Sequence, residues 1–470
     1  GAFDVQMAVS NKVGPDGRDI AYGFMPKEGQ LTIATDLADI LPYMGFSDDR
    51  VKGGNSRSYT RYFIVADSIS GIQQTCAQLR QTAIGTLNVT VSVADEQDAE
   101  EIFELEAVDS NGKVAGFAHA RVGVNELKLP PGDYTLRIGQ LGRPWTDGTL
   151  SVSVNADAAT EADIEVPATG RITYTVGGDH FDGTVKERIP ARISVQAGQN
   201  AAAESGIIRR EFTASGEGVF LLEPGEYTIT VSRGYEYEIC QESISLAAGA
   251  NFELDCFLER SVDSSGWVAG DLHIHTERSI DAVVPVQDRV TQLAAVGLER
   301  MPITDHDVIS VLDPYVDEVG AREYISLIAG DEVSPIAAHS NGFPITPRPD
   351  RDTYFGVQWF GDYDSTGCAL ENNPQYPAIW QQMREIYESR IIQINHPRSN
   401  SQGFFNTFSY DPIVGVDSFE AGDFDFNWDA MELINANDVG DALNYSLADW
   451  FSFFNQGAHK AGTAVSDCHN

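Results

Sequence analysis

Histidines and carboxylic acids recur at the ends of short apolar runs in the C-terminal part of this 470-residue chain. Seven of the nine histidines lie after residue 270, and six of those seven follow such a run. The first run, "GWVAGDLHIH", ends in His273 and His275. Short buried-strand patterns alternate here with helical ones, of which "VPVQDRVTQLAAVGL" (284–298) is the clearest. This alternation predicts β-α units around a parallel sheet.

The residues that end these runs are all able to bind a metal ion. In a parallel β/α barrel the carboxyl ends of the strands open on one face, so residues far apart in sequence converge there. Nine nitrogen and oxygen ligands exceed what one zinc ion takes, which predicts two or three ions. Imidazoles and carboxylates without clustered thiolates suit zinc, manganese or iron. The nine candidates are His273, His275, Asp281, His306, Glu332, His339, His396, Asp467 and His469.

The order of these motifs resembles a known family. "DLHIHT" with Asp281, then "ITDHD", "GDEVS" followed by "HSNGFPI", "NHPR" and "SDCH" are similar to the motifs of PHP (polymerase and histidinol phosphatase) metal-dependent hydrolases. "GDEVSPIAAHSNGFPI" and "MELINAN" most resemble the CehA-like branch, and the resemblance covers about 266–470. It implies a distorted (β/α)7 barrel that holds two or three ions.

The resemblance also implies which residues share an ion. His273, His275, Glu332 and Asp467 would hold the first ion. Glu332 would bridge to a second ion held with His339 and His396, and Asp281, His306 and His469 would hold the third.

We expect a hydrolase in which a metal-bridging hydroxide attacks a phosphoester or a carboxyl or carbamate ester of a small molecule. Three residues are candidates for catalytic roles. Asp305 or Asp307 could shuttle a proton, or could only hold His306 in place. Arg398 could bind a phosphate or carboxylate, or could form a structural ion pair. The aromatic-rich segment 352–380 could form a lid, or could pack on other domains.

Two similar segments precede this region. One, 86–166, carries "LPPGDYTLRI", and the other, 167–262, carries "LEPGEYTITV". Both alternate apolar and polar residues over short runs, which predicts two tandem antiparallel β-sandwich modules. We expect Gly132 and Gly225 to supply a permissive backbone at the shared turn.

The first 85 residues are expected to form a further β-rich domain. "GQLTIATDL" and "SYTRYFIVADSISGI" have strand patterns, and "GIQQTCAQLRQTA" has the pattern of a short helix. The predicted organisation is therefore three β-rich domains (1–85, 86–166 and 167–262) followed by the barrel at 263–470.

The net charge of −39 argues against a nucleic-acid partner, and no run is apolar enough for a membrane span. Cys240 and Cys256 lie in consecutive strand-like runs and could staple a hairpin, or could stay as buried thiols. A disulfide there would favour an extracellular, cell-surface or periplasmic location. The alternative to a hydrolase is a cell-surface or filament-forming structural protein, with surface assembly or homo-oligomers, in which the barrel is secondary.

The two ends of the sequence also carry expectations. The start lacks Met and any signal-peptide pattern, which fits a processed or trimmed N-terminus. Chains of the resembled family continue beyond the last ligand, whereas this sequence stops at Asn470. Either further chain follows in the native protein, or the last strand packs unusually.

Overall fold

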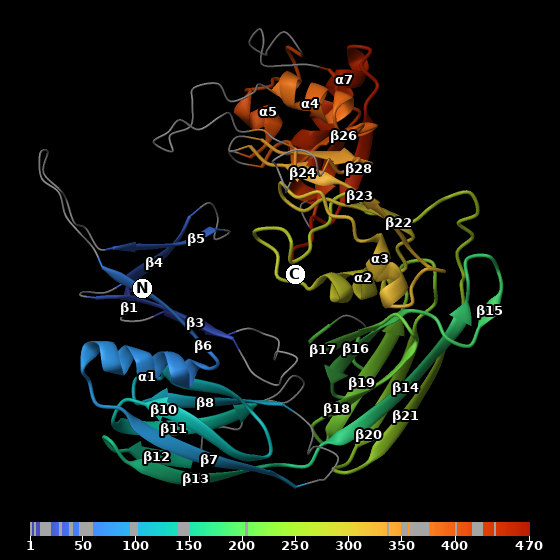
Figure 1. Cartoon of the computed structure of the whole chain (residues 1–470). Helices are drawn as coiled ribbons and strands as arrows, with labels where there is room; N and C mark the ends of the chain where they lie inside the picture. The colour runs from blue at the N-terminus through green and yellow to red at the C-terminus, as the bar shows by residue number, and fades with distance from the viewer. Residues whose placement is uncertain are drawn as a thin grey trace, which may run out of the picture.

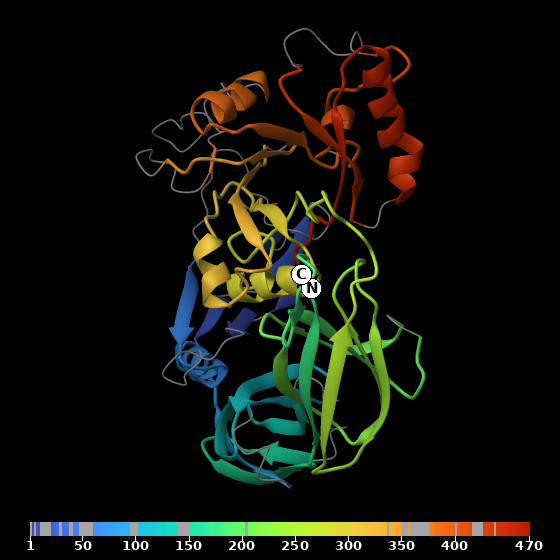
Figure 2. The same cartoon turned by 90° about the vertical axis from the view of Figure 1, so that its right-hand side faces the viewer.

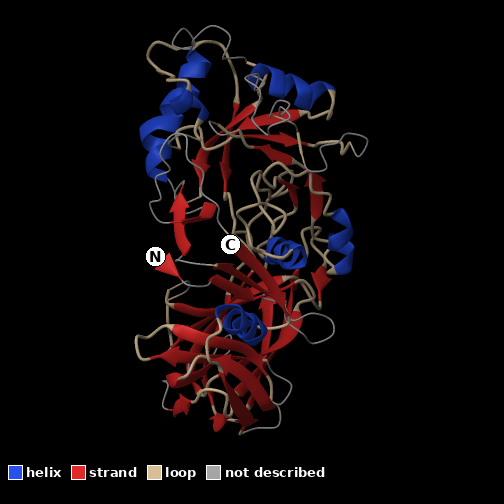
Figure 3. Cartoon of the chain, turned by 60° about the vertical axis from the view of Figure 1, so that its left-hand side comes forward, coloured by secondary structure: helices blue, strands red, loops and turns tan. Residues whose placement is uncertain are grey.

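The computed structural model shows two β-sandwiches and a C-terminal region of mixed strands and helices. Figures 1 and 2 show the C-terminal region above the second sandwich, with the first sandwich beside and below the second. Figure 3 shows that strands dominate the sandwich half. The described residues are 2–3, 6–9, 20–27, 31–36, 41–46, 60–94, 102–139, 150–202, 205–335, 338–348, 356–357, 359, 376–399, 402–415, 426–436 and 439–470.

The N-terminal part contains two small sheets and one helix. The sheets have the strand orders β1-β4-β5 and β2-β3-β6. Helix α1 begins after Ser68, whose side chain accepts a hydrogen bond from the Gly71 N–H, and this confirms the predicted short helix. The bounds are β1 Ala2–Phe3, β2 Gln6–Val9, β3 Ala21–Pro26, β4 Leu31–Asp36, β5 Leu41–Phe46, β6 Arg61–Ala66 and α1 Ile69–Arg80.

The first sandwich packs a three-stranded sheet, β10-β7-β13, against a four-stranded sheet, β12-β11-β8-β9. Strand β7 alternates buried and partly exposed residues over most of its length, so that Leu87, Val89 and Val91 lie in the core. The strands are β7 Gly85–Val93, β8 Phe103–Asp109, β9 Val114–Ala120, β10 Gly123–Leu129, β11 Gly132–Gly139, β12 Leu150–Val154 and β13 Ala159–Val166.

The second sandwich repeats this topology. Its sheets are β15-β14-β18, with β21 also paired to β14, and β17-β16-β19-β20. In both sandwiches the last strand runs parallel to the first, β13 beside β7 and β21 beside β14. The strands are β14 Gly170–Asp179, β15 Val185–Lys186, β16 Ala191–Ala197, β17 Ile207–Thr213, β18 Glu217–Leu222, β19 Gly225–Ser232, β20 Cys240–Leu246 and β21 Asn251–Leu258.

The shared Pro-Gly-acid-Tyr-Thr motif fixes the same corner in each sandwich. The Tyr134 hydroxyl donates to the Pro130 carbonyl at 2.7 Å, and the Tyr227 hydroxyl donates to the Glu223 carbonyl at 2.8 Å. The expected role of the two glycines was wrong, because neither adopts a positive φ. Gly225 is instead a close-packing position, since a Cβ there would lie 3.1 Å from the Tyr227 hydroxyl.

Cys240 and Cys256 form a disulfide. Cys240 begins β20 in one sheet, and Cys256 lies on β21 in the other sheet. The bridge therefore links the two sheets of the sandwich and does not staple a hairpin as the sequence suggested. Of the other cysteines that the structure describes, Cys76 and Cys468 are free.

The C-terminal region holds a two-stranded sheet, β22-β23, and a five-stranded sheet, β24-β25-β26-β27-β28. Its strands are β22 Arg300–Ile303, β23 Ser326–Ala329, β24 Asp331–Val333, β25 Ser340–Phe343, β26 Ile391–Ile394, β27 Ala430–Asn435 and β28 Ala461–Val465. Its helices are α2 Val286–Ala295, α3 Asp313–Glu318, α4 Tyr376–Glu385, α5 Phe404–Thr407, α6 Val439–Asp441, the π-helix η3 Ala442–Ser446 and α7 Leu447–Asn455.

A (β/α)7 barrel is not confirmed, because the described sheets are open and helices are few. The expected parallel sheet is a mixed one, since β25 is antiparallel to both β24 and β26. The connection from β24 to β25 is too short for the helix that a parallel crossover needs. The segment that holds His273 and His275 is no strand, and forms only an isolated bridge from Ile274 to Cys468. A second isolated bridge joins His306 to Glu332.

The second sandwich and the C-terminal region share one hydrophobic core. A single buried cluster includes Ile193 and Val231 of the sandwich together with Val290 and Leu293 of α2. The buried Arg233 side chain crosses the junction and donates to the carbonyls of Pro190 at 2.9 Å and Ala294 at 2.5 Å. The sandwich is therefore a structural support for helix α2, which follows the His273–His275 segment.

Candidate metal centre

The nine candidate ligands come from six segments of the chain and lie in one cluster. Neighbouring imidazole rings have centroids 4.0 to 6.1 Å apart, and the six histidines form a continuous series. His306 follows β22, His396 follows β26, and Asp467 and His469 follow β28. Glu332 follows β23 by three residues and itself lies within the short strand β24.

Glu332 is the centre of the cluster. One carboxylate oxygen, Oε2, lies 3.0 Å from His273 Nε2, 3.3 Å from His275 Nε2 and 3.2 Å from His306 Nδ1. The other oxygen, Oε1, lies 3.1 Å from His339 Nδ1 and 3.4 Å from His396 Nε2. The side chain is fully buried. A single carboxylate therefore contacts five of the six imidazoles.

Two further carboxylates complete the cluster. Asp467 Oδ1 lies 3.2 Å from His273 Nε2 and 3.1 Å from His275 Nε2. Asp281 Oδ2 lies 3.1 Å from His306 Nε2 and 3.2 Å from His469 Nε2. Seven of the nine candidates fall into three overlapping groups with ligand atoms within 4.8 Å of one another, and His396 and Asp467 belong to none of these groups. The groups are His273, His275 and Glu332; His306, Glu332 and His339; and His275, Asp281, His306 and His469.

The charge balance fits bound cations. Among the described residues, the ion-pair partners of Glu332, Asp281 and Asp467 are all histidines, and none is a lysine or arginine. Burying carboxylates without a permanent counter-charge is costly, and divalent ions remove that cost. His396 Nδ1 is also buried without a hydrogen-bond partner in the described part of the chain, whereas the other ring nitrogen, Nε2, faces Glu332.

The protein without metal balances these charges with protons. Burial lowers the pKa of His306, but Glu332 and Asp281 outweigh it and raise the pKa to about 9. Burial dominates at His275 and lowers its pKa to about 4, so that this imidazole is neutral at pH 7. Burial raises the pKa of Glu332, but His273 and His306 hold it well below its usual range. The additional proton of a charged His306 occupies a ring nitrogen that a metal ion would otherwise take.

Part of this region matches a known protein family. Residues 271–416 match the family model of the PHP domain. This part of the chain is a PHP domain. No curated protein matches the chain.

Solved structures resemble the chain only distantly. A two-domain protein from Bacteroides vulgatus, described as containing a predicted PHP-like metal-dependent phosphoesterase, has 17% identity and a TM-score of 0.28, covering 43% of this chain and 52% of its own. The Bacillus anthracis TIE protein has 13% identity and a TM-score of 0.16, covering 58% of this chain, and this chain spans about half (53%) of that protein. A minor pilin of Streptococcus agalactiae has 11% identity and a TM-score of 0.21, covering 38% of this chain and 97% of its own. Such low TM-scores say nothing about what this chain binds or assembles with.

Backbone conformation in the PHP domain is strained next to the cluster. His396 has a φ of 25°, Asp467 a φ of 50° and Asp307 a φ of 53°. Non-glycine residues rarely adopt positive φ, and such conformations concentrate at functional sites. Two of the three residues are candidate ligands, and the third, Asp307, is the neighbour of the candidate ligand His306.

The candidate catalytic residues lie around the cluster and do not touch its ligand atoms. Asp305 accepts from the Thr276 N–H at 2.6 Å and from the Thr276 hydroxyl at 3.0 Å. Asp307 accepts from the Ser334 N–H at 3.0 Å and from the Trp359 indole at 2.7 Å. Ser334 in turn lies 2.5 Å from His306 Nδ1, so Asp307 acts on that imidazole only indirectly.

The Arg398 guanidinium is engaged in a buried ion pair. It donates to both oxygens of Asp449, at 2.7 and 2.5 Å, and to the Tyr410 carbonyl at 2.9 Å. This geometry is the structural ion pair that the sequence left open, and Arg398 also lines the pocket beside His396.

Three polar residues behind the ligands were not selected from the sequence. The Asn395 amide donates to Glu332 Oε1 at 2.8 Å, and the Asn435 amide donates to Asp467 Oδ2 at 3.0 Å. Glu432 lies 2.7 Å from His273 Nδ1. The runs "QINH" and "MELINAN" do place these residues at strand ends, but only the fold shows which ligands they contact.

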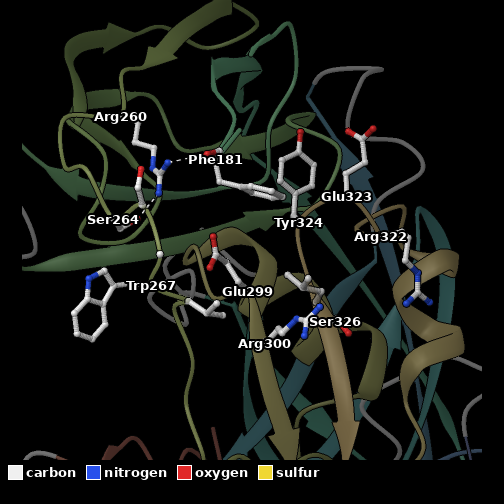
Figure 4. Close-up of a pocket in the computed structure, with 14 residues that line it drawn as sticks. Phe181, Arg260, Ser264, Trp267, Glu299, Arg300, Arg322, Glu323, Tyr324 and Ser326 are labelled. Atoms are coloured by element: carbon white, nitrogen blue, oxygen red, sulfur yellow. Dashed lines mark hydrogen bonds between the residues drawn. The ribbon is translucent and has the colours of Figure 1, made fainter. Parts of the chain in front are cut away.

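Two pockets lined by described residues adjoin the C-terminal region. One, of about 110 Å³, lies beside the cluster and is lined by His396, Arg398, Glu432 and Asn435 among others. The other, of about 460 Å³, lies at the junction with the second sandwich (Figure 4). Its Arg260 and Arg322 side chains are paired with Glu236 and with Asp313 and Asp317. The smaller pocket is therefore the one that adjoins ligand-bearing residues.

Two other expectations are only partly addressed by the structure. Most of the aromatic segment 352–380 lies outside the described residues, so the lid prediction has no test here. Among the described helices, none is long and apolar enough to cross a membrane.

Proposed function

We propose that this chain is a metal-dependent hydrolase whose PHP domain binds two or three divalent ions, of zinc, manganese or iron. The observation that carries the proposal is Glu332, a buried carboxylate with both oxygens shared among five imidazoles. A carboxylate placed in this way is suited to bridging two ions and to offsetting their charge.

The ligand allocation is part of the proposal. His273, His275, Glu332 and Asp467 would hold one ion, and Glu332, His339 and His396 a second. Asp281, His306 and His469 would hold a third. The short distances from Asp467 to His273 and His275, and from Asp281 to His306 and His469, support this allocation. His306 also lies near Glu332, so this imidazole is close to two of the three ligand groups and could bind the ion of either group.

The substrate we propose is a small molecule with a phosphoester or a carboxyl or carbamate ester. Divalent ions in such a site supply Lewis acidity and a nucleophile derived from water at neutral pH. The polar pocket of about 110 Å³ beside His396 fits a group of a few heavy atoms, and we place the scissile group there. Asp305 and Asp307 would act by holding Thr276 and Ser334 beside ligand histidines. Arg398 would act through its ion pair with Asp449, which orders the loop after His396.

Metal analysis combined with a substrate panel tests the proposal. Purified protein is expected to retain two or three ions per chain and to hydrolyse members of a panel of phosphomonoesters, phosphodiesters and carboxyl esters. Glu332→Gln should lose at least about one ion and most of the turnover, because it replaces the shared carboxylate. His459→Ala is the matched control, since His459 is exposed and stacks only on Phe454. A folded protein without ions, or turnover that survives in Glu332→Gln, would refute the proposal.

Three finer points belong to the same proposal. The seven-stranded barrel is supported by the isolated bridges Ile274–Cys468 and His306–Glu332, which join segments around the cluster. The boundaries 1–85, 86–166, 167–262 and 263–470 follow the change from sandwich strands to mixed elements. The CehA-like branch rests on the two motifs quoted from the sequence, "GDEVSPIAAHSNGFPI" and "MELINAN".

We also propose an extracellular, cell-surface or periplasmic location. The support is the Cys240–Cys256 disulfide, because such bridges persist in oxidising compartments. Tandem sandwiches and strong acidity would suit a role in surface assembly as well, with the hydrolase as its active part.

A further inference from the structure

Glu432 lies directly behind a candidate ligand and belongs to none of the metal groups. It sits on β27, is 1% exposed, and its Oε1 lies 2.7 Å from His273 Nδ1. The opposite ring nitrogen, His273 Nε2, lies 3.0 Å from Glu332 Oε2 and 3.2 Å from Asp467 Oδ1. The His273 ring is therefore held between Glu432 on one side and the ligand cluster on the other.

The other contacts of Glu432 are all with hydrogen-bond donors. Oε1 also accepts from the Gln393 amide at 2.9 Å. Oε2 accepts from the backbone N–H of His396 at 2.5 Å and from the Asn435 amide at 2.9 Å. Both oxygens of Glu432 therefore accept hydrogen bonds from these residues, and His273 Nδ1 is in position to be the fourth donor.

This pattern fixes the state of the His273 ring. If Nδ1 carries the hydrogen and donates it to Glu432, the lone pair of Nε2 is directed at the ligand cluster. A neutral imidazole can bind a cation only through the nitrogen that lacks a hydrogen, so the acceptor at Nδ1 selects the competent tautomer.

Glu432 also connects His273 to two other ligands. Its Oε2 binds the backbone of His396, which has an unfavourable positive φ, and the same oxygen binds Asn435. The Asn435 amide also donates to Asp467 Oδ2 at 3.0 Å. One buried carboxylate thereby restrains His273, His396 and Asp467 together.

We infer that Glu432 is a positioning residue that sets the His273 tautomer and orients three ligands of the metal centre. This inference rests on the proposed function, because a tautomer matters here only if His273 binds a cation. It adds a residue outside the metal groups that would act on the ions through its neighbours, and that also lines the pocket beside His396.

The replacement Glu432→Gln tests the inference with almost no change of shape. If the amide oxygen faces His273, the amide NH2 faces the donors of His396 and Asn435. If the amide is turned around, its NH2 faces His273 Nδ1 and forces the hydrogen onto Nε2. In either orientation the acceptor pattern is lost, so we expect the affinity for Zn²⁺ to fall by about 10- to 100-fold.

The experiment measures Zn²⁺ affinity by chelator competition in wild type, Glu432→Gln and the control Glu385→Gln. Glu385 is an exposed residue at the end of α4, and its replacement should leave the affinity unchanged. The melting temperature of the metal-free proteins separates positioning from folding. Weaker binding by Glu432→Gln with a wild-type melting temperature supports the inference, and unchanged binding overturns it. If wild type itself binds no Zn²⁺, the proposed function fails and not merely this inference.

A second measurement keeps the inference testable if Glu432→Gln does not fold. The ¹⁵N NMR signals of the His273 ring in Zn²⁺-loaded wild-type protein report which nitrogen carries the hydrogen. A protonated Nδ1 with a metal-bound Nε2 supports the inference. The reverse arrangement would overturn it.

Discussion

The Nε atom of Arg289, on helix α2, donates a hydrogen bond to the backbone carbonyl of His275 at 2.8 Å. The same guanidinium donates to the Cys468 carbonyl at 3.3 Å, between Asp467 and His469. The side chain is 3% exposed, and it also donates to Gln292 Oε1 at 3.0 Å and to the main-chain oxygen of Asn470 at 3.3 Å. This buried arginine ties together two ligand-bearing segments that have no continuous strand pairing between them.

Replacing Arg289 with methionine should therefore weaken the fold around the cluster. The carbonyls of His275 and Cys468 would lose charged donors, which corresponds to about 2 kcal/mol of unfolding free energy. Chemical denaturation of the metal-free protein measures this change. Arg300→Met is the control, because Arg300 is exposed on β22 and outside the cluster. Equal stabilities of the two variants would contradict the expectation.

Metal affinity should depend on pH through His306. In the metal-free fold, Glu332 and Asp281 outweigh burial and raise the pKa of His306 from 6.5 to about 9. Because folding raises this pKa, protonation of His306 stabilises the metal-free fold. This stabilisation is complete below about pH 6.5 and is lost as the pH rises through about 9. A bound ion must displace this proton, so its affinity should rise by up to about tenfold per pH unit across the window. Calorimetry in buffers of different ionisation enthalpy measures the released proton, and an affinity that is flat from pH 6.5 to 9 would exclude this coupling.

The PHP domain should not fold without the second sandwich. Val290 and Leu293 of α2 belong to the same buried cluster as Ile193 and Val231 of the sandwich. A chain of 263–470 would expose this surface to water, whereas a chain of 167–470 retains it. We expect cooperative thermal unfolding and little dye binding only for the longer chain. Cooperative unfolding of 263–470 alone would show that the shared core is dispensable.

Reduction of the Cys240–Cys256 disulfide should destabilise the second sandwich. The two cysteines are 16 residues apart, and closing a loop of that size contributes about 3 kcal/mol by the chain-entropy model. The double replacement Cys240→Ser/Cys256→Ser measures this loss by chemical denaturation. Thiol counting under denaturing, non-reducing conditions should find three of the five cysteines reactive. If all five thiols react, the disulfide does not form in the protein, and the support for an oxidising compartment is lost.

Local patterns in the sequence were sufficient for many elements. The 3.6-residue period over 284–298 corresponds to α2, although Pro285 precedes its first helical residue and is not inside the helix. The repeated Tyr134 and Tyr227 motifs correspond to the same corner in two sandwiches of equal topology. These features depend on interactions within a few residues, or on one face of a strand, and periodicity reports both directly.

The sequence alone determined the types and order of the nine candidate ligands and the repeat of the two sandwiches. Only the tertiary structure decided that Glu332 contacts five imidazoles, that Arg398 pairs with Asp449, and that Glu432 lies behind His273, 159 residues away in the chain. Composition and spacing describe what each segment can do by itself. Which buried acid meets which base is set by the packing of distant segments, because a buried donor or charge is stable only where the fold supplies its partner.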